Sequence, residues 1–286
     1  MNCRRLHAVP PSGVMNAEEA AVRAYYERGG ERDRLSDGRG QLEFVRTTEI
    51  VARRLPPAPA VIADIGGGPG RYALWLASLG HQVEHRDLMP LHIGQLEADA
   101  AGAPGIRTAI GDARGLDLPD ASVDAVLLLG PFYHLLSRAE RTAAIREAAR
   151  ILRPGGPLFA AAISRWATRI DGIIGKRTYL AHPVVLDLID EVERTGNLQP
   201  LQASAFTAYT HRPDDLRAEL TEGGFEVADL VCVEGPGLIL PDLDARMADP
   251  ADRAAILDAA RSLERVPELI GFGPHLLATA IRPATG

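Results

Sequence analysis

The sequence predicts an α/β protein whose doubly wound, mostly parallel sheet of seven strands carries helices on both faces. Two observations lead to this fold class. Short aliphatic runs alternate with helical segments from residue 61 onwards, and the first run ends in a glycine-rich loop that opens a helix. Continuous apolar runs are typical of parallel strands covered on both faces, and their alternation with helices is typical of a doubly wound sheet.

The first strand and its loop form the segment VIADIGGGPGRY, residues 61–72. The acid Asp64 stands near the end of the strand, and the loop contains Gly66, Gly67, Gly68 and Gly70. Without side chains at these positions, backbone N–H groups at the start of the next helix can approach a ligand closely. The segment therefore predicts a cradle for a nucleotide-like ligand, although a plain strand-to-helix turn could use similar residues.

The spacing of the glycines limits which class of ligand the loop can bind. A dinucleotide-binding loop follows G-x-G-x-x-G, and here Arg71 occupies the place of the third glycine. The observed pattern is instead Asp64-x-Gly66-x-Gly68-x-Gly70. A nicotinamide-dependent dehydrogenase is therefore disfavoured.

Acids also follow the next two expected strands. Strand 82–86 ends in Asp87, about twenty residues beyond the glycines, and strand 106–110 is followed by Asp112. Because the carboxyl ends of parallel strands meet at one edge of a sheet, where such sheets bind ligands, we expect both acids near the glycine loop. A helix cap at Asp87 and an ordinary turn at Asp112 are the alternatives. Further strands are expected over 123–129, 158–163, 225–233 and 275–281.

Together these motifs resemble the class I S-adenosylmethionine (SAM) dependent methyltransferases of the bacterial small-molecule type, methyltransferase-11/25-like. The resemblance covers most of residues 60–163 and resumes over 212–233, with Pro-Gly-Gly before the fifth strand and Gly-Gly-Phe-Glu-Val at the sixth. It implies SAM as the cofactor. The cofactor-binding residues it implies are Asp64 and the four glycines for the methionine part, Asp87 for the ribose, Asp112 for the adenine amino group, and the neighbours Leu88, Met89, Ala113 and Gly130.

The resemblance and the segment lengths predict the domain organisation. N-terminal helices in this family form a lid over the cofactor and the substrate pocket, and two later segments are too long for plain connections. We interpret those two as a cap beside the active site, although they could simply thicken the fold. The expected order is a disordered lead at 1–15 with Met15 as an alternative start, a helical lid at 16–57, the SAM-binding core at 58–163, a cap insertion at 164–211, and the completion of the core at 212–286 with a second helical insertion at about 238–269.

Two histidines are candidate catalytic residues. A histidine near its ordinary pKa suits a general base, and His134 follows the fourth strand, whose end lies beside the methyl group in the resembling family. His211, just before the helix expected at 212, is the second candidate, and a structural role explains either histidine equally well. Aromatic candidates for the substrate pocket, for which core packing is the competing interpretation, are Tyr25, Tyr26, Phe132, Tyr133, Trp166, Phe206 and Tyr209.

The resemblance implies methyl transfer to an oxygen or nitrogen, less readily a carbon, of a small-molecule metabolite. The loop Gly130-Pro-Phe-Tyr133 lacks the Asn or Asp of nucleic-acid amino-methylating enzymes of this class, and neither cysteine lies near the fourth strand. Nucleobase substrates are therefore disfavoured. Two alternatives stay open: a SAM-binding enzyme that promotes a cyclisation or rearrangement without methyl transfer, and a non-catalytic SAM-binding protein.

The composition limits the classes of partner and the cellular location that we expect. The net charge is −7 and the pI is about 5.6, which argues against a nucleic-acid partner. No apolar stretch reaches 18 residues, so no membrane span is expected. With only Cys3 and Cys232, we expect no disulfide framework, no metal site and a cytoplasmic location. The expected assembly is a monomer or homodimer that binds a small-molecule acceptor.

Overall fold

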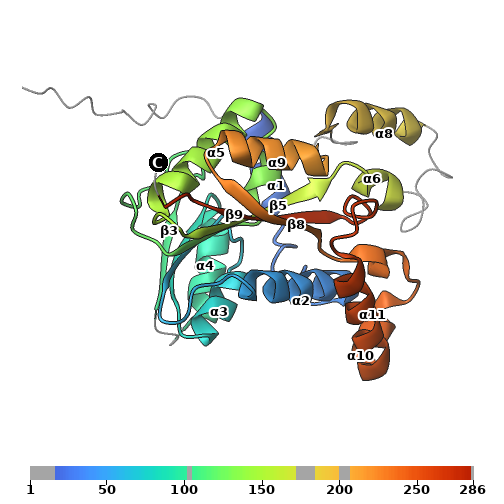
Figure 1. The fold of residues 1–286 in the computed structure, drawn as a ribbon, viewed down its shortest axis with the longest axis horizontal. Helices are drawn as coiled ribbons and strands as arrows, with labels where there is room; N and C mark the ends of the chain where they lie inside the picture. The colour runs from blue at the N-terminus through green and yellow to red at the C-terminus, as the bar shows by residue number, and fades with distance from the viewer. Residues whose placement is uncertain (1–16, 102–104, 172–183, 200–206, 285–286) are drawn as a thin grey trace, which may run out of the picture.

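The computed structural model describes residues 17–101, 105–171, 184–199 and 207–284. The described strands form a single sheet in which most neighbours run parallel (Figure 1). The strands are β1 (Val61–Ile65), β2 (Gln82–Asp87), β3 (Ile106–Ile110), β4 (Ala125–Leu128), β5 (Pro157–Ser164), β6 (Asn197–Leu198), β7 (Ala208–His211), β8 (Glu226–Cys232) and β9 (His275–Ile281). The predicted α/β fold class is confirmed.

Seven of these strands lie in the order β3-β2-β1-β4-β5-β9-β8. The first five run parallel, whereas β9 is antiparallel to both β5 and β8. These are the seven strands that the sequence predicts, and their bounds differ from the predicted ones by at most two residues. The sequence did not predict the two short strands β7, which pairs in parallel with the last two residues of β5, and β6, which pairs with β7.

Helices cover both faces of the sheet, with α2, α3 and α4 on one face and α5 and α9 on the other (Figure 1). A capping box starts α5, since the Ser137 side chain accepts a hydrogen bond from the Glu140 backbone and the Glu140 side chain accepts one from the Ser137 backbone. The helical elements are α1 (Ala17–Tyr26), α2 (Gly38–Ala52), α3 (Arg71–Ser78), α4 (Pro90–Asp99), η1 (Pro131–His134), α5 (Arg138–Ile151), α6 (Ala167–Ile170), α8 (Val184–Thr195), α9 (Pro213–Glu222), η3 (Gly235–Ile239), α10 (Leu243–Ala248) and α11 (Pro250–Leu263).

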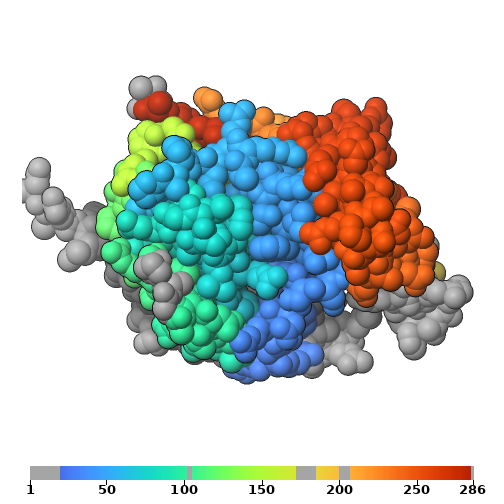
Figure 2. Space-filling view, turned by 90° about the horizontal axis from the view of Figure 1, so that it is seen from below, coloured from blue at the N-terminus to red at the C-terminus, as the bar shows by residue number. Residues whose placement is uncertain are grey.

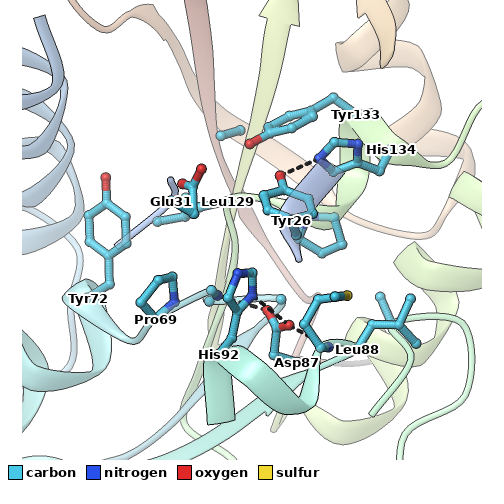
Figure 3. Close-up of a pocket in the computed structure, with 18 of the residues that line it drawn as sticks. Tyr26, Glu31, Pro69, Tyr72, Asp87, Leu88, His92, Leu129, Tyr133 and His134 are labelled. Carbon is cyan, nitrogen blue, oxygen red and sulfur yellow. Dashed lines mark hydrogen bonds and ion pairs between the residues drawn. The ribbon is translucent and has the colours of Figure 1, made fainter. Parts of the chain in front are cut away.

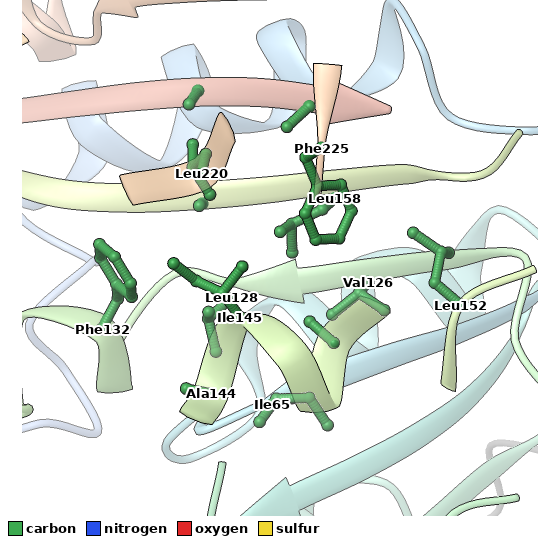
Figure 4. Packing of buried hydrophobic residues seen from close by; sticks show 14 of the residues in the cluster. Ile65, Val126, Leu128, Phe132, Ala144, Ile145, Leu152, Leu158, Leu220 and Phe225 are labelled. Carbon is green, nitrogen blue, oxygen red and sulfur yellow. The ribbon is translucent and has the colours of Figure 1, made fainter. Parts of the chain in front are cut away.

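The buried strands send alternate side chains into two hydrophobic clusters, one on each face of the sheet. In β4, Val126 and Leu128 belong to the cluster that includes α5 and α9, whereas Leu127 belongs to the cluster that includes α2, α3 and α4. Figure 4 shows the first cluster, in which Leu220 of α9 and Leu128 both take part. Because both faces are covered, these strands read as nearly continuous apolar runs in the sequence.

The segment between β8 and β9 contains the helical elements η3, α10 and α11. Its helices α10 and α11 form a third hydrophobic cluster together with α2. The cluster includes Leu42 of α2, Leu243 of α10 and Ile256 of α11. Figure 2 shows the result on one face of the molecule, where the red-orange C-terminal helices lie beside the blue N-terminal segment. Within the described residues, no helix has both the length and the apolar character needed to cross a bilayer.

Candidate functional site

A cavity lies at the carboxyl ends of β1, β2 and β4, where the strand order reverses between β1 and β4 (Figure 3). Open α/β sheets bind their ligands at this position. The sequence-predicted residues that line the cavity are Tyr26, Gly66, Gly67, Gly68, Asp87, Leu88, Met89, Asp112, Ala113, Gly130, Tyr133 and His134. The fold therefore brings two of the predicted acids, most of the glycine loop and one predicted histidine to a single site.

The glycine loop has a backbone that side chains would obstruct. Gly66, Gly68 and Gly70 have φ values of 62°, 59° and 84°, in the left-handed region that favours glycine. A Cβ at Gly67 would lie 2.2 Å from Oδ2 of Asp64. Gly70 is outside the cavity lining, and a Cβ there would lie 2.4 Å from a buried leucine side chain of α4. Glycine is thus required by backbone conformation and by space at this loop.

Asp64 lies beneath the glycine loop and is not part of the cavity lining. The residue is 1% exposed, and its Oδ2 is 3.1 Å from Nδ1 of His85 on β2. Its other oxygen, Oδ1, is buried and has no hydrogen-bond partner among the described residues. A buried polar atom without a partner is costly, so Oδ1 suits an interaction with a donor group brought by a ligand or by water.

Asp87 connects three elements at the centre of the site. Its Oδ2 accepts a hydrogen bond from the Gly68 backbone at 2.9 Å, and its Oδ1 accepts one from the Met89 backbone at 2.8 Å and lies 3.0 Å from Nδ1 of His92. Burial alone would raise the pKa of Asp87, but these hydrogen bonds and the nearby imidazole lower it. The charged carboxylate therefore holds the glycine loop against the end of β2. His92 is not among the residues predicted from the sequence, although it lies in the first turn of the helix that follows Asp87.

Asp112 lies in a second charged part of the site. Its carboxylate accepts hydrogen bonds from the Arg114 guanidinium at 2.6 Å and from the Arg114 backbone at 2.8 Å, and Arg114 also bonds to Glu140 of α5. Burial alone would raise the pKa of Asp112, but the hydrogen bonds from Arg114 lower it. A ligand here meets a carboxylate and a guanidinium side by side.

The loop after β4 approaches the glycine loop closely. A Cβ at Gly130 would lie 2.7 Å from the carbonyl oxygen of Gly66, and a Cβ at Gly66 would lie 2.6 Å from the ring of Pro131. No side chain fits between the two loops at this point. The contact gives a structural reason for glycine at position 130, where nucleic-acid amino-methylating enzymes have Asn or Asp.

Tyr26 of α1 and His134 of η1 form a hydrogen bond with each other within the site. The Tyr26 hydroxyl oxygen is 2.6 Å from Nε2 of His134, and the two rings meet edge to face with centroids 5.4 Å apart (Figure 3). Burial lowers the pKa of His134 to about 4, so the imidazole is neutral at neutral pH. Burial also raises the pKa of Tyr26 well above its ordinary value, so the phenol keeps its proton.

A chain of ion pairs lines another part of the cavity, and the sequence did not single out its members. Arg34 donates to Glu31 at 2.6 Å and to both oxygens of Glu43 at 2.6 and 3.1 Å. Nδ1 of His275 lies 2.5 Å from Glu234 and 3.9 Å from Glu43. Burial alone would lower the pKa of His275, but these two carboxylates raise it to about 9. Positions so far apart in the chain share no local pattern that could link them.

Several predicted site residues lie away from the cavity lining. Phe132 and His211 are both fully buried and stack on each other with ring centroids 5.1 Å apart. Nε2 of His211 lies 3.4 Å from Glu219, which also forms a buried ion pair with Arg141. These contacts place His211 and Phe132 in the protein core. The other candidates outside the lining are Tyr25, Trp166 and Tyr209, and Phe206 falls outside the described residues.

Comparison with known sequences identifies the central part of the chain. Residues 62–156 match the family model described as a methyltransferase domain. Over 131 residues the chain is 34% identical to a ubiquinone/menaquinone biosynthesis C-methyltransferase, UbiE, of Caulobacter vibrioides, and the match covers 42% of this chain and 51% of that protein. The chain thus spans about half the length of this relative.

Comparison with solved structures agrees with this match. A SAM-dependent methyltransferase from Methanosarcina mazei has a TM-score of 0.55 at 20% identity, covering 82% of this chain and 97% of that chain. The cyclase SpnF has a TM-score of 0.54 at 19% identity, covering 84% and 81% of the two chains. At such identities the likeness shows the fold alone. Residues 62–156 are therefore a methyltransferase domain by sequence, and the fold of the described residues is similar to that of SAM-dependent methyltransferases.

Proposed function

We propose that this protein transfers the methyl group of SAM to an oxygen or nitrogen of a small-molecule metabolite. The observation that carries the proposal is the convergence of the glycine loop, Asp87 and Asp112 on one cavity at the switch point of the sheet. Each of these features alone has an ordinary structural explanation. Their meeting at the place where open α/β sheets bind ligands is the argument for a shared ligand.

The described residues fit SAM. The glycine backbone, with Asp64 buried beneath it, suits the methionine part, and Asp112 suits the adenine amino group beside the apolar Leu88 and Met89. A carboxylate has about four lone-pair positions, so Asp87 can accept from one ribose hydroxyl in addition to its three protein hydrogen bonds. When bound, SAM supplies an electrophilic methyl group on a positively charged sulfur.

Helix α1 acts as a lid in this proposal. Tyr26 lines the cavity, and Arg23 donates a hydrogen bond to the carbonyl oxygen of Leu88 at 3.4 Å, beside the expected adenine position. A covered cavity excludes water and holds donor and acceptor in line, which favours methyl transfer. We therefore propose that α1 moves when ligands enter and leave. The cap role of residues 164–211 stays a prediction.

The ion-pair chain supports a polar small-molecule acceptor. Glu31, Arg34, Glu43 and His275 line the same cavity as the proposed cofactor residues. They offer carboxylate, guanidinium and imidazole groups next to one another, which suits an acceptor with its own hydrogen-bonding groups. The net charge of −7 gives no support for a nucleic-acid acceptor.

Two other functions on the same fold compete with this proposal. The Caulobacter relative is named a C-methyltransferase, which favours carbon as a second candidate acceptor atom. The fold of SpnF, a cyclase, leaves a SAM-binding enzyme without methyl transfer as an alternative.

Calorimetry and methyl labelling test the proposal together. Titration with SAM measures binding, and incubation with SAM carrying a ¹³C-methyl group and the low-mass fraction of a cell extract detects transfer by mass spectrometry. We expect binding and one labelled small molecule, in which the methyl carbon shift distinguishes O, N and C attachment. Absence of SAM binding would reject the function, whereas binding with no labelled product would favour the non-methylating alternatives.

A further inference from the structure

Two polar side chains of the cavity form a hydrogen bond with each other although they come from separate elements. Tyr26 belongs to α1 and His134 to η1, which follows β4, and both line the cavity (Figure 3). Their hydroxyl oxygen and Nε2 lie 2.6 Å apart, a short distance for a neutral hydrogen bond. Tyr26 also contacts His92, the partner of Asp87, with ring centroids 5.2 Å apart.

The surroundings of His134 fix the direction of this hydrogen bond. Nδ1 of His134 lies 3.2 Å from the carbonyl oxygen of Thr207. A carbonyl oxygen can only accept, so Nδ1 carries the proton of the neutral ring, and Nε2 is the nitrogen with the lone pair. The Tyr26 hydroxyl is therefore the donor to Nε2, and its own oxygen lone pairs stay available to accept.

We propose that Tyr26 and His134 form a proton relay for the methyl acceptor, with Tyr26 contacting the acceptor directly. This inference rests on the proposed function. The O–H or N–H bond of a neutral acceptor breaks, its proton moves to the oxygen of Tyr26, and its electron pair forms the bond to the methyl carbon. The phenol proton of Tyr26 moves to Nε2 of His134, and the electron pair of the broken methyl–sulfur bond remains on sulfur. Two protons move, one to Tyr26 and one from Tyr26, so the net result is one proton on His134, and no oxidant or further reactant is needed.

The site can hold the imidazolium that the relay produces. After transfer, Nδ1–H still donates to the Thr207 carbonyl and the new Nε2–H donates to the Tyr26 oxygen, so both ring donors are satisfied. Burial opposes the charge, whereas the negative charge of Asp87 favours it. Among the described residues, the titratable or charged side chains that face the pair include Tyr25, Glu31, Arg34, Asp87, His92 and Tyr133.

The relay exists only while α1 covers the cavity, because Tyr26 is part of that helix. Closing the lid would then exclude water and complete the proton path in the same movement. His134 acts through Tyr26, whereas Tyr26 itself is the residue expected to touch the acceptor. Removing the Tyr26 hydroxyl should therefore slow methyl transfer more than it weakens SAM binding.

The experiment compares the wild type with Tyr26→Phe and with Thr142→Val. The control also deletes one helix hydroxyl, which donates at 2.8 Å to the Arg138 carbonyl on the exposed side of α5. One measurement is ¹⁵N NMR of histidine-labelled protein bound to S-adenosylhomocysteine at pH 7. The other is the rate of ¹³C-methyl transfer from SAM to the low-mass fraction of a cell extract, with SAM affinity measured alongside.

The relay predicts a neutral His134 with the proton on Nδ1, and an Nε2 resonance that shifts in Tyr26→Phe but not in the control. It also predicts transfer at least about 100-fold slower in Tyr26→Phe, the usual effect of losing acid–base catalysis, with SAM affinity within about threefold of the wild type. If Tyr26→Phe fails to bind SAM, His134→Gln provides the same comparison of transfer rate with affinity.

Two results would overturn the relay. One is a His134 ring that is charged at pH 7 or carries its only proton on Nε2, since such a nitrogen cannot accept from Tyr26. The other is wild-type transfer by Tyr26→Phe. A wild type that binds SAM but labels no product would instead count against the proposed methyl transfer, and the NMR measurement would still decide the direction of the hydrogen bond between Tyr26 and His134.

Discussion

Replacing Asp87 by asparagine should weaken SAM binding by loosening the glycine loop. The substitution removes one charge and turns one acceptor oxygen into a donor. In the structure both carboxylate oxygens accept: Oδ2 from Gly68, and Oδ1 from Met89 with His92 at 3.0 Å. The amide oxygen of asparagine can occupy the position of only one of these two carboxylate oxygens. At the other position the amide nitrogen must then face an N–H donor. At least one charge-assisted hydrogen bond is lost.

The size of the effect follows from the hydrogen bond that is lost. A hydrogen bond to a charged group contributes about 1.5–3 kcal/mol. Since each 1.4 kcal/mol corresponds to about a factor of ten in affinity, the Kd for SAM should rise roughly 10- to 150-fold at neutral pH. Loss of the proposed ribose contact would add to this effect.

Titration calorimetry with SAM measures this change, and circular dichroism checks that the variant is folded. Asp117→Asn is the matched control, because it removes a carboxylate that accepts from Arg86 at 2.6 Å but is 61% exposed and outside the cavity lining. The control should keep wild-type affinity. A folded Asp87→Asn protein whose Kd stays within twofold of the wild type would refute this assignment of Asp87.

Two further predictions concern the same cavity. Gly67→Ala should weaken SAM binding at least about tenfold by calorimetry, since its Cβ collides with a buried carboxylate, whereas the exposed Gly94→Ala of α4 should not. Because Glu234 and Glu43 raise the pKa of His275 to about 9, its ion pairs should stabilise the protein by about 3 kcal/mol below pH 6.5, and this stability should be lost as pH rises through 9. Urea unfolding of the wild type and of His275→Gln at several pH values measures this contribution. Equal losses in the free energy of unfolding of the two proteins as pH rises through 9 would contradict it.

The sequence predicted that the glycine loop and two acids lie at one cavity, because the signals for these residues are local. The glycine loop, Asp87 and Asp112 each stand directly at the end of a strand, and parallel strands bring such ends to one edge. The same logic gave His134 a place in the cavity. The sequence could not show that Asp64 lies beneath the glycine loop, because this depends on the face of β1 from which its side chain projects. In the structure the side chain contacts His85, the residue that pairs with Asp64 on β2.

The remaining parts of the site depend on tertiary contacts that leave no local pattern. Glu43 lies on α2 and His275 on β9, and only the complete fold makes them neighbours. His211 was a reasonable catalytic candidate in the sequence, but the pairing of β7 with β5 buries it beside Glu219. The hydrogen bond between Tyr26 and His134 likewise depends on how α1 lies over the cavity.

The most direct test of the account is to count methyl groups and S-adenosylhomocysteine in the same reaction. Purified protein would be incubated with ¹³C-methyl SAM and the low-mass fraction of a cell extract, and both products would be quantified by mass spectrometry. We predict one labelled methyl group in a small molecule for each S-adenosylhomocysteine formed, with both lost together in Asp87→Asn at low SAM. SAM bound at the cavity with neither product formed would contradict the proposed methyl transfer.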